Sequence, residues 1–322
     1  SYYGLARELT RIADVCHERG VPLIVDEAHG GHMRFLPEGA PKSALASGAD
    51  LAVQSCHKTL GSLVGSAQLH VSRASLVSAE RVQHALNFLQ TTSPNYLLLA
   101  SLDVMRRWLW REGEPLFAKG VDDAKHLEAA IDAMHGLKVF RASIDTRLTD
   151  HRQDPLRLVV NVSDSGWSGY EVERHLRTQF QVEDEMADWF NVVYVLSPHD
   201  DPAAKGRLLE GLRAVAKAPK SGTKTPRLAD NADEAHMLQP PIPPLAMAPR
   251  DAALAEQIVV DLKSATGRTC AEMVMFYPPG IPLLMPGEVV SRETIDVCRR
   301  LLAVGANPYA SDPTFETIRV VK

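Results

Sequence analysis

The chain is short of cysteine. Its 322 residues include four cysteines, and no two of them have the C-x-x-C spacing of a zinc or redox site. They are Cys16, Cys56, Cys270 and Cys298. Free thiols in a reducing compartment are therefore expected.

Long apolar runs and an excess of basic residues are also missing. No run approaches the roughly 20 apolar residues that a membrane helix needs, and the formal net charge is -5. Neither a membrane nor a nucleic acid is therefore an expected partner. No secretory signal is visible, so we expect a cytoplasmic protein. Because the chain begins with Ser1 rather than Met, we expect a fragment. The alternative that a missing upstream segment targets the protein to an organelle stays open.

The composition that is present is that of an ordinary globular protein, with 45% hydrophobic and 23% charged residues. Helical spacing of apolar residues predicts a helix near the start, and short apolar runs predict buried strands after it. The predicted helices are 5–16 and 41–47, and the predicted strands are 21–25, 51–54 and 67–71. This alternation favours an α/β fold with a mixed, mostly parallel sheet and helices on both faces.

The pattern of predicted secondary structure changes after the predicted helices 78–89 and 96–110. Short helices and strands then alternate, a Pro- and Lys-rich stretch intervenes, and a last compact unit closes the chain. Helices are predicted at 121–134, 170–178, 208–215, 250–262 and 291–302, and strands at 156–162, 192–196 and 273–276. The predicted domains are 1–118, a small α+β domain 119–217, a linker 218–244 and a C-terminal α+β domain 245–322.

Two strand ends carry the residues that a pyridoxal 5'-phosphate (PLP) enzyme needs. Such an enzyme uses a lysine amine to form a Schiff base and a carboxylate to keep the pyridine nitrogen protonated. It also needs a small residue beneath the ring and hydroxyl groups for the phosphate. Asp26 and Ala28 follow one predicted strand, and Ser55 and Lys58 follow the next. Sites in α/β sheets lie at such strand ends.

From the local sequence alone, Lys58 could equally be a surface lysine after a strand, whereas a metal site and a helicase motif are weaker interpretations. His29, His32, His57 and His70 lack the i, i+4 pairing and the cysteine pair of a metal site, so no metal is expected. Asp26-Glu27-Ala28-His29 also spells the acidic motif of a helicase, but the chain has no matching phosphate loop G-x-x-x-x-G-K-[ST].

Several separated motifs resemble the Orn/Lys/Arg decarboxylase family, in its short bacterial form and without the N-terminal part. The segment 16–29, which ends in Asp26-Glu27-Ala28-His29, is similar to the family's strand for the cofactor nitrogen. Ser55-Cys56-His57-Lys58 is similar to its Ser-x-His-Lys motif. The other matching motifs are at 89–96, 169–173, 185–188, 277–282 and 286–288.

The resemblance implies a partial large domain of the PLP-transferase type I fold. It implies that Lys58 forms the Schiff base with PLP and that Asp26 pairs with the pyridine nitrogen. Ala28 packs on the ring, Ser55 and His57 lie near the phosphate, and His29 lies near the ring or the substrate. The catalytic residues implied are Lys58, His29 and His57.

The resemblance further implies a homodimer or higher homo-oligomer. Thr91, Thr92 and Ser93 then reach the phosphate bound by a neighbouring subunit. The implied reaction is decarboxylation of arginine, lysine or ornithine to a polyamine-pathway amine and CO2, and the sequence does not distinguish these substrates.

Two alternatives stay open. The chain could be a non-catalytic remnant that serves assembly or regulation, or it could catalyse another PLP reaction, such as transamination or a lyase step. An exposed sheet edge predicts that the isolated chain aggregates or needs a partner.

Overall fold

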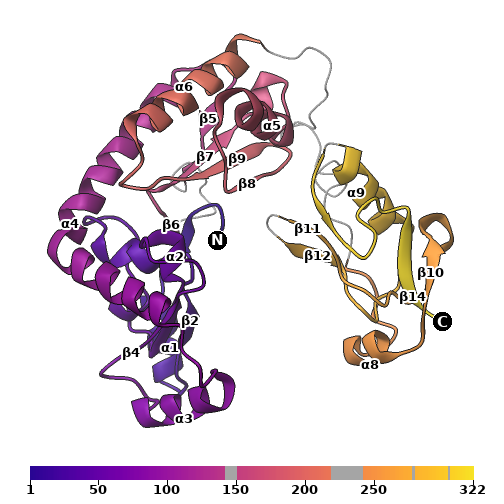
Figure 1. Ribbon diagram of the computed structural model, residues 1–322, viewed down its shortest axis with the longest axis horizontal. Helices are drawn as coiled ribbons and strands as arrows, with labels where there is room; N and C mark the ends of the chain where they lie inside the picture. The colour runs from indigo at the N-terminus through magenta and orange to yellow at the C-terminus, as the bar shows by residue number, and fades with distance from the viewer. Residues whose placement is uncertain (142–150, 219–241, 278–279, 304) are drawn as a thin grey trace. The chain divides into compact units, whose positions relative to one another are not determined.

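The computed structural model describes residues 1–141, 151–218, 242–277, 280–303 and 305–322 (Figure 1). The chain divides into two compact units. The first unit comprises residues 1–133, 139–159 and 195–206, and the second comprises residues 134–138, 160–194 and 207–322. Among the described residues, no helix is both long and apolar enough to span a bilayer.

A three-stranded sheet in the first unit carries the candidate site. Its strands β2 (Ile24–Asp26), β3 (Leu51–Gln54) and β4 (Gln68–Val71) lie in the order β2-β3-β4. The β2 and β3 strands are parallel, whereas β3 and β4 are antiparallel. All three strands overlap the predicted ranges, although β2 begins three residues later than predicted. The mixed character of the sheet is confirmed, with one parallel and one antiparallel pair. Ala52 of β3 packs with Ala44 and Ala49 in a small buried cluster.

The start of the chain differs from the prediction of one helix over 5–16. Leu5–Arg7 form strand β1, which pairs antiparallel with β6 (His151–Gln153), and helix α1 covers only Thr10–His17. Leu5 has the right spacing for the helix, but its backbone bonds are taken by a strand far along the chain. Gly20 follows α1 with φ 66°, a conformation that glycine adopts without strain.

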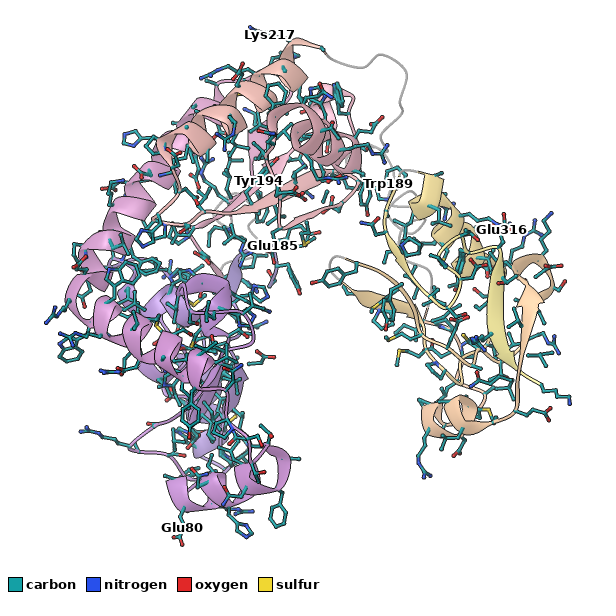
Figure 2. All side chains as sticks on the ribbon, in the orientation of Figure 1. Glu80, Glu185, Trp189, Tyr194, Lys217 and Glu316 are labelled. Atoms are coloured by element: carbon teal, nitrogen blue, oxygen red, sulfur yellow. The ribbon has the colours of Figure 1, made fainter. Side chains whose placement is uncertain are left out.

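The other helices of the first unit are short, except for one. They comprise the 3-10 turns η1 (Gly31–Phe35) and η2 (Leu45–Ser47), the single turn α2 (Cys56–Thr59), and α3 (Ala79–Leu89). The helix α3 buries none of its side chains, and its first-turn residue Glu80 points into solvent (Figure 2).

Helix α4 runs unbroken from Tyr96 to Asp132. We predicted two helices here, 96–110 and 121–134, so this prediction was wrong. Pro115 lies inside α4 and removes one backbone donor, yet the helix continues because its buried face continues across the proline. The buried apolar residues on that face are Met105, Leu109, Phe117, Val121, Ala124, Leu127 and Ile131. The helix therefore runs through residue 118, where we predicted a domain boundary.

A four-stranded sheet has the order β5-β7-β9-β8. Its strands are β5 (Lys138–Val139), β7 (Arg157–Asn161), β8 (Met186–Ala187) and β9 (Asn191–Val195). Helices α5 (Gly169–Phe180) and α6 (Pro202–Lys217) accompany it. A reciprocal capping box between Ser168 and Glu171 begins α5.

The described residues of the C-terminal region form two small sheets and two helices around their own core, which includes Val274, Leu284 and Ile318. The elements are α8 (Pro249–Leu254), β10 (Gln257–Asp261), β11 (Val274–Phe276), β12 (Ile281–Leu284), α9 (Arg292–Ala303), β13 (Pro308–Tyr309) and β14 (Thr317–Val321). The predicted helix 250–262 was wrong in its second half, because the β-branched run at 258–260 pairs with β14 as a strand. Most of the predicted linker 218–244 falls outside the described residues.

Candidate active site

Lys58 lies on the single helical turn α2, which is labelled in Figure 1. This turn directly follows β3. Ser55, in an extended conformation, turns the chain from strand into helix. Its N–H donates to the carbonyl of Ala28 at 3.3 Å, which ties the end of β3 to the segment after β2. Because β2 and β3 are parallel, both segments lie at one edge of the sheet. The structure therefore brings the two predicted site segments together.

His29 contacts the Lys58 amine. Its Nε2 lies 3.0 Å from Nζ of Lys58, and its Nδ1 lies 3.3 Å from Nη2 of Arg157. The ring of Tyr2 lies against the imidazole, with centroids 4.9 Å apart. Burial, followed by the charges of Lys58 and Arg157, lowers the pKa of His29 from 6.5 to about 4. The imidazole is therefore neutral at physiological pH, while the Lys58 side chain remains exposed.

Asp26 ends β2 with an exposed carboxylate. Its Oδ1 accepts from the N–H of Ala28 at 3.0 Å, which fixes the orientation of the carboxylate. In the described part of the chain no hydrogen bond is found to Oδ2. A carboxylate in this state can accept a further bond, such as one from a protonated ring nitrogen. Ala28, two residues on, presents only a methyl group.

The side chain of His57 is held by a bond to a backbone carbonyl in the loop that follows α2. Its Nδ1 lies 2.8 Å from the carbonyl oxygen of Ser66. Since a carbonyl only accepts, Nδ1 carries the proton of this bond, and Nε2 remains for another partner. The hydroxyl of Ser55 makes no cap bond to α2 and is available in the same way.

Thr91, Thr92 and Ser93 lie on the exposed connection between α3 and α4. The N–H of Ser93 donates to Oγ1 of Thr91 at 3.2 Å. Across the residues that the structure describes, no hydrogen bond joins these three to Lys58, His29 or Asp26. Their predicted contact with a phosphate therefore requires a second copy of the chain and stays a prediction.

Arg157, the buried neighbour of His29, was not among the residues predicted from the sequence. It begins β7 and is only 3% exposed. The two residues are 128 positions apart, so no local motif could have joined them. The preceding turn holds Asp154, whose carboxylate lies 3.0 Å from Nε2 of the buried His32. Burial acts to raise the pKa of Asp154, but the charge and contact of His32 outweigh it and the pKa is lowered.

Glu27 is a second residue that was missed, although it stands inside the Asp26-Glu27-Ala28-His29 motif. Its buried carboxylate accepts from the N–H of Ala44 at 2.7 Å and from Nε2 of Gln54 at 2.6 Å. Burial raises the pKa of Glu27, and those two bonds oppose the rise. The buried side chain of Glu27 therefore ties the end of β2 to the end of β3. This bond helps to fix the backbone that carries Asp26 before it and His29 after it.

The thiol of Cys56 is buried beneath the site. Cys56 is 0% exposed, its Sγ lies 3.9 Å from the carbonyl oxygen of Gln54, and burial raises its pKa. A cavity of about 160 Å³ adjoins α2 and is lined by His57, Lys58, Trp108 and Asp154, among others. Within the described residues, no group of three or more His, Cys, Asp and Glu side chains is arranged to hold a metal ion.

Comparison with known proteins points to one family. The family model for the major domain of Orn/Lys/Arg decarboxylases matches residues 1–204, and the model for their C-terminal domain matches residues 232–317. An arginine decarboxylase of Halalkalibacterium halodurans is 39% identical over 100% of this chain and 64% of its own length. An arginine decarboxylase of Bacillus subtilis is also 39% identical, with the same coverage. The chain thus spans 64% of the length of these relatives.

Solved structures show the same fold. The constitutive lysine decarboxylase of Escherichia coli aligns with a TM-score of 0.77 at 19% identity, over 100% of this chain and 57% of that chain. An alanine–glyoxylate aminotransferase from Nostoc aligns with a TM-score of 0.51 at 19% identity, over 66% of this chain and 58% of that one.

Proposed function

Because the chain belongs to the Orn/Lys/Arg decarboxylase family, we propose that it carries the cofactor-bonding lysine of a PLP-dependent decarboxylase acting on a basic amino acid. The observation that carries this proposal is the exposed amine of Lys58, 3.0 Å from the imidazole of His29 and beside the strand end that holds Asp26. The chain covers 64% of its relatives, so the activity proposed is that of the whole protein.

The residues at the sheet edge suit PLP. The carboxylate of Asp26 would pair with the pyridine nitrogen, and Ala28 leaves room for the ring. Ser55 and His57 would contact the phosphate, and Lys58 would bond to the cofactor. Bound PLP supplies an electron-withdrawing ring that accepts the charge left when CO2 departs. The protein fixes the orientation of the substrate and holds the protons at His29 and Lys58.

Thr91, Thr92 and Ser93 would complete the phosphate site from a second copy of the chain. Their exposure in the connection between α3 and α4 supports this, since nothing within the described residues covers them. A homo-oligomer would then be required for full cofactor affinity.

Arginine is the substrate that the relatives favour. Proteins named arginine decarboxylase match this chain over 100% of its length at 36–39% identity. The constitutive lysine decarboxylase of Escherichia coli matches only 24% of the chain in sequence. The long match includes every segment of the candidate site, whereas the short one covers a fraction of the molecule.

Covalent trapping tests the role of Lys58. The purified chain is mixed with PLP and reduced with borohydride, and the modified lysine is located by peptide mass. We expect the label on Lys58, and we expect Lys58→Ala to abolish it. Lys42→Ala is the matched control, because Lys42 is exposed and close in sequence. Equal labelling of several lysines, or retention of the label in Lys58→Ala, would contradict the proposal.

Product analysis on the full-length protein tests the reaction. Arginine, lysine and ornithine are supplied in turn, and CO2 and the amine product are measured. Release of CO2 with agmatine from arginine is expected, at a rate well above those for the other two substrates. A keto acid product would instead identify a transaminase.

A further inference from the structure

Three side chains form a line of contacts that ends at the Lys58 amine. Nη2 of Arg157 lies 3.3 Å from Nδ1 of His29, and Nε2 of the same ring lies 3.0 Å from Nζ of Lys58. Arg157 is 3% exposed and is held by the turn that precedes β7, where its N–H donates to the carbonyl of Asp154 at 3.1 Å. Arg157 is therefore the buried end of the line, and Lys58 is the exposed end.

The hydrogen atoms in this line follow from donor and acceptor chemistry. A guanidinium has donors only and keeps its charge at any ordinary pH. Nδ1 of His29 must therefore accept from Arg157. A neutral imidazole carries one N–H, which must then be on Nε2. Nε2–H faces Nζ of Lys58, so Lys58 can complete the line only by accepting, which a free amine does and an ammonium group does not.

The opposite arrangement loses a bond. If Lys58 were an ammonium group donating to Nε2, the proton of the neutral ring would move to Nδ1 and point at the N–H of Arg157. Two donors would then face each other beside the buried guanidinium, which is unfavourable in a site of low polarity.

The charges around His29 support a neutral ring. Burial is the largest cause that disfavours a charged imidazole, the guanidinium of Arg157 acts in the same direction, and the carboxylate of Asp26 opposes them. The net effect lowers the pKa of His29 from 6.5 to about 4. Near neutral pH the question thus reduces to which of two tautomers is present.

We propose that Arg157 is a positioning residue that holds His29 in its Nε2–H tautomer, so that the ring donates to Lys58 and stabilises the free amine. The free amine is the form that bonds to a carbonyl carbon, so the significance of the line rests on the proposed role of Lys58. Arg157 contacts Nδ1 of His29, on the side of the ring away from Nε2 and the amine. Its effect passes through the ring of His29.

Nitrogen NMR on histidine-labelled chain tests the tautomer directly and needs no cofactor. The chain has twelve histidines, and the signals absent from His29→Gln identify those of His29. Near neutral pH we expect a protonated Nε2 and an unprotonated Nδ1. A Nδ1–H tautomer or an imidazolium in the wild-type chain overturns the proposal.

Two replacements of Arg157 separate positioning from packing. Arg157→Met keeps much of the length but removes the donors, whereas Arg157→Lys keeps a donor and the charge. We expect the methionine variant to shift His29 towards the Nδ1–H tautomer, and the lysine variant to retain Nε2–H.

The rate of PLP bonding at Lys58 near neutral pH gives a second readout. It should fall several-fold in Arg157→Met, since the free amine loses its donor, and much less in Arg157→Lys. An unchanged rate in a folded methionine variant counts against the proposal. If circular dichroism shows that this variant is unfolded, the wild-type tautomer and the lysine variant still decide.

The two proposals fail in different ways. Absence of the borohydride label from wild-type Lys58 removes the proposed function and leaves the tautomer of His29 as measured. A label on Lys58 together with the Nδ1–H tautomer removes the inference about Arg157 alone.

Discussion

At the scale of single residues, Asp50 joins three segments of the first unit through one carboxylate. Its side chain is 0% exposed and accepts from His17 at 2.8 Å and from the N–H groups of Leu23 and Leu76 at 2.7 and 2.6 Å. Burial acts to raise the pKa of Asp50, but these bonds outweigh it and bring the pKa to about 2. The carboxylate thereby fixes α1 and the entrance of β2, which leads to the site.

Replacing this carboxylate by an amide should therefore destabilise the protein. In Asp50→Asn an amide N–H₂ meets backbone donors, and we expect a loss of about 2–4 kcal/mol in the free energy of unfolding. Urea denaturation measures it, with the exposed Asp14→Asn as a control expected to change little.

The pH dependence of this loss follows from the lowered pKa of Asp50. Its contribution is fully present above the ordinary value of 3.8 and is lost as pH falls through 3.8 towards 2. The difference between wild type and Asp50→Asn should therefore shrink in that window. A difference that stays constant down to pH 2 would contradict this assignment.

The site residues divide by how far their partners lie along the chain. Asp26, Ala28, Ser55 and Lys58 stand in short motifs at predicted strand ends, so the sequence was enough to bring them together. Arg157 reaches His29 only through tertiary packing across 128 positions. Such contacts leave no periodic or local signal, so a single sequence does not reveal them.

At the scale of secondary structure, α5 begins at a glycine that has no room for a side chain. A Cβ on Gly169 would lie 2.1 Å from the carbonyl oxygen of Asp188 and 2.3 Å from that of Asn191. We expect Gly169→Ala to lower the free energy of unfolding by about 3 kcal/mol, because backbone would have to move.

Gly206 offers the matched comparison. It lies inside α6, and a Cβ there would meet nothing within 4 Å. Gly206→Ala should raise stability by about 0.5–1 kcal/mol, since alanine loses less entropy in a helix. Thermal unfolding of both variants checks the pair, and equal effects would show that close approach at Gly169 is not decisive.

The predicted elements failed where tertiary contacts overrode local signals. Residues 250–262 carry a helical pattern, but β14 recruits 257–261 into a strand. Helix α4 passes Pro115 because apolar contacts continue on both sides of it. Central strands such as β3 were predictable because their apolar runs are bounded by polar strand ends.

At the scale of the whole molecule, the surface of α3 and the start of α4 exposes several large apolar side chains. Phe88, Leu89 and Leu97 are 77%, 86% and 73% exposed, and apolar residues exposed together often mark an interface between proteins. We expect this surface to bind a second copy of the chain, so that the purified protein self-associates.

Light scattering after size exclusion measures this association. The double variant Phe88→Glu with Leu89→Glu should shift the protein towards monomer, whereas Leu254→Glu, at an apolar residue 73% exposed on α8, should not. A monodisperse wild-type monomer would sink the expectation.

The buried cysteines make it possible to measure how often each compact unit opens. Cys56 lies in the first unit, and Cys270 and Cys298 lie in the core of the second. Burial raises the pKa of the Cys270 and Cys298 thiols to about 11 and about 12, and it also raises that of Cys56. An alkylating reagent therefore reaches each thiol only when its surroundings open. The order in which the three cysteine-containing peptides are alkylated would rank the two units by how often they open locally. No engineered label is needed.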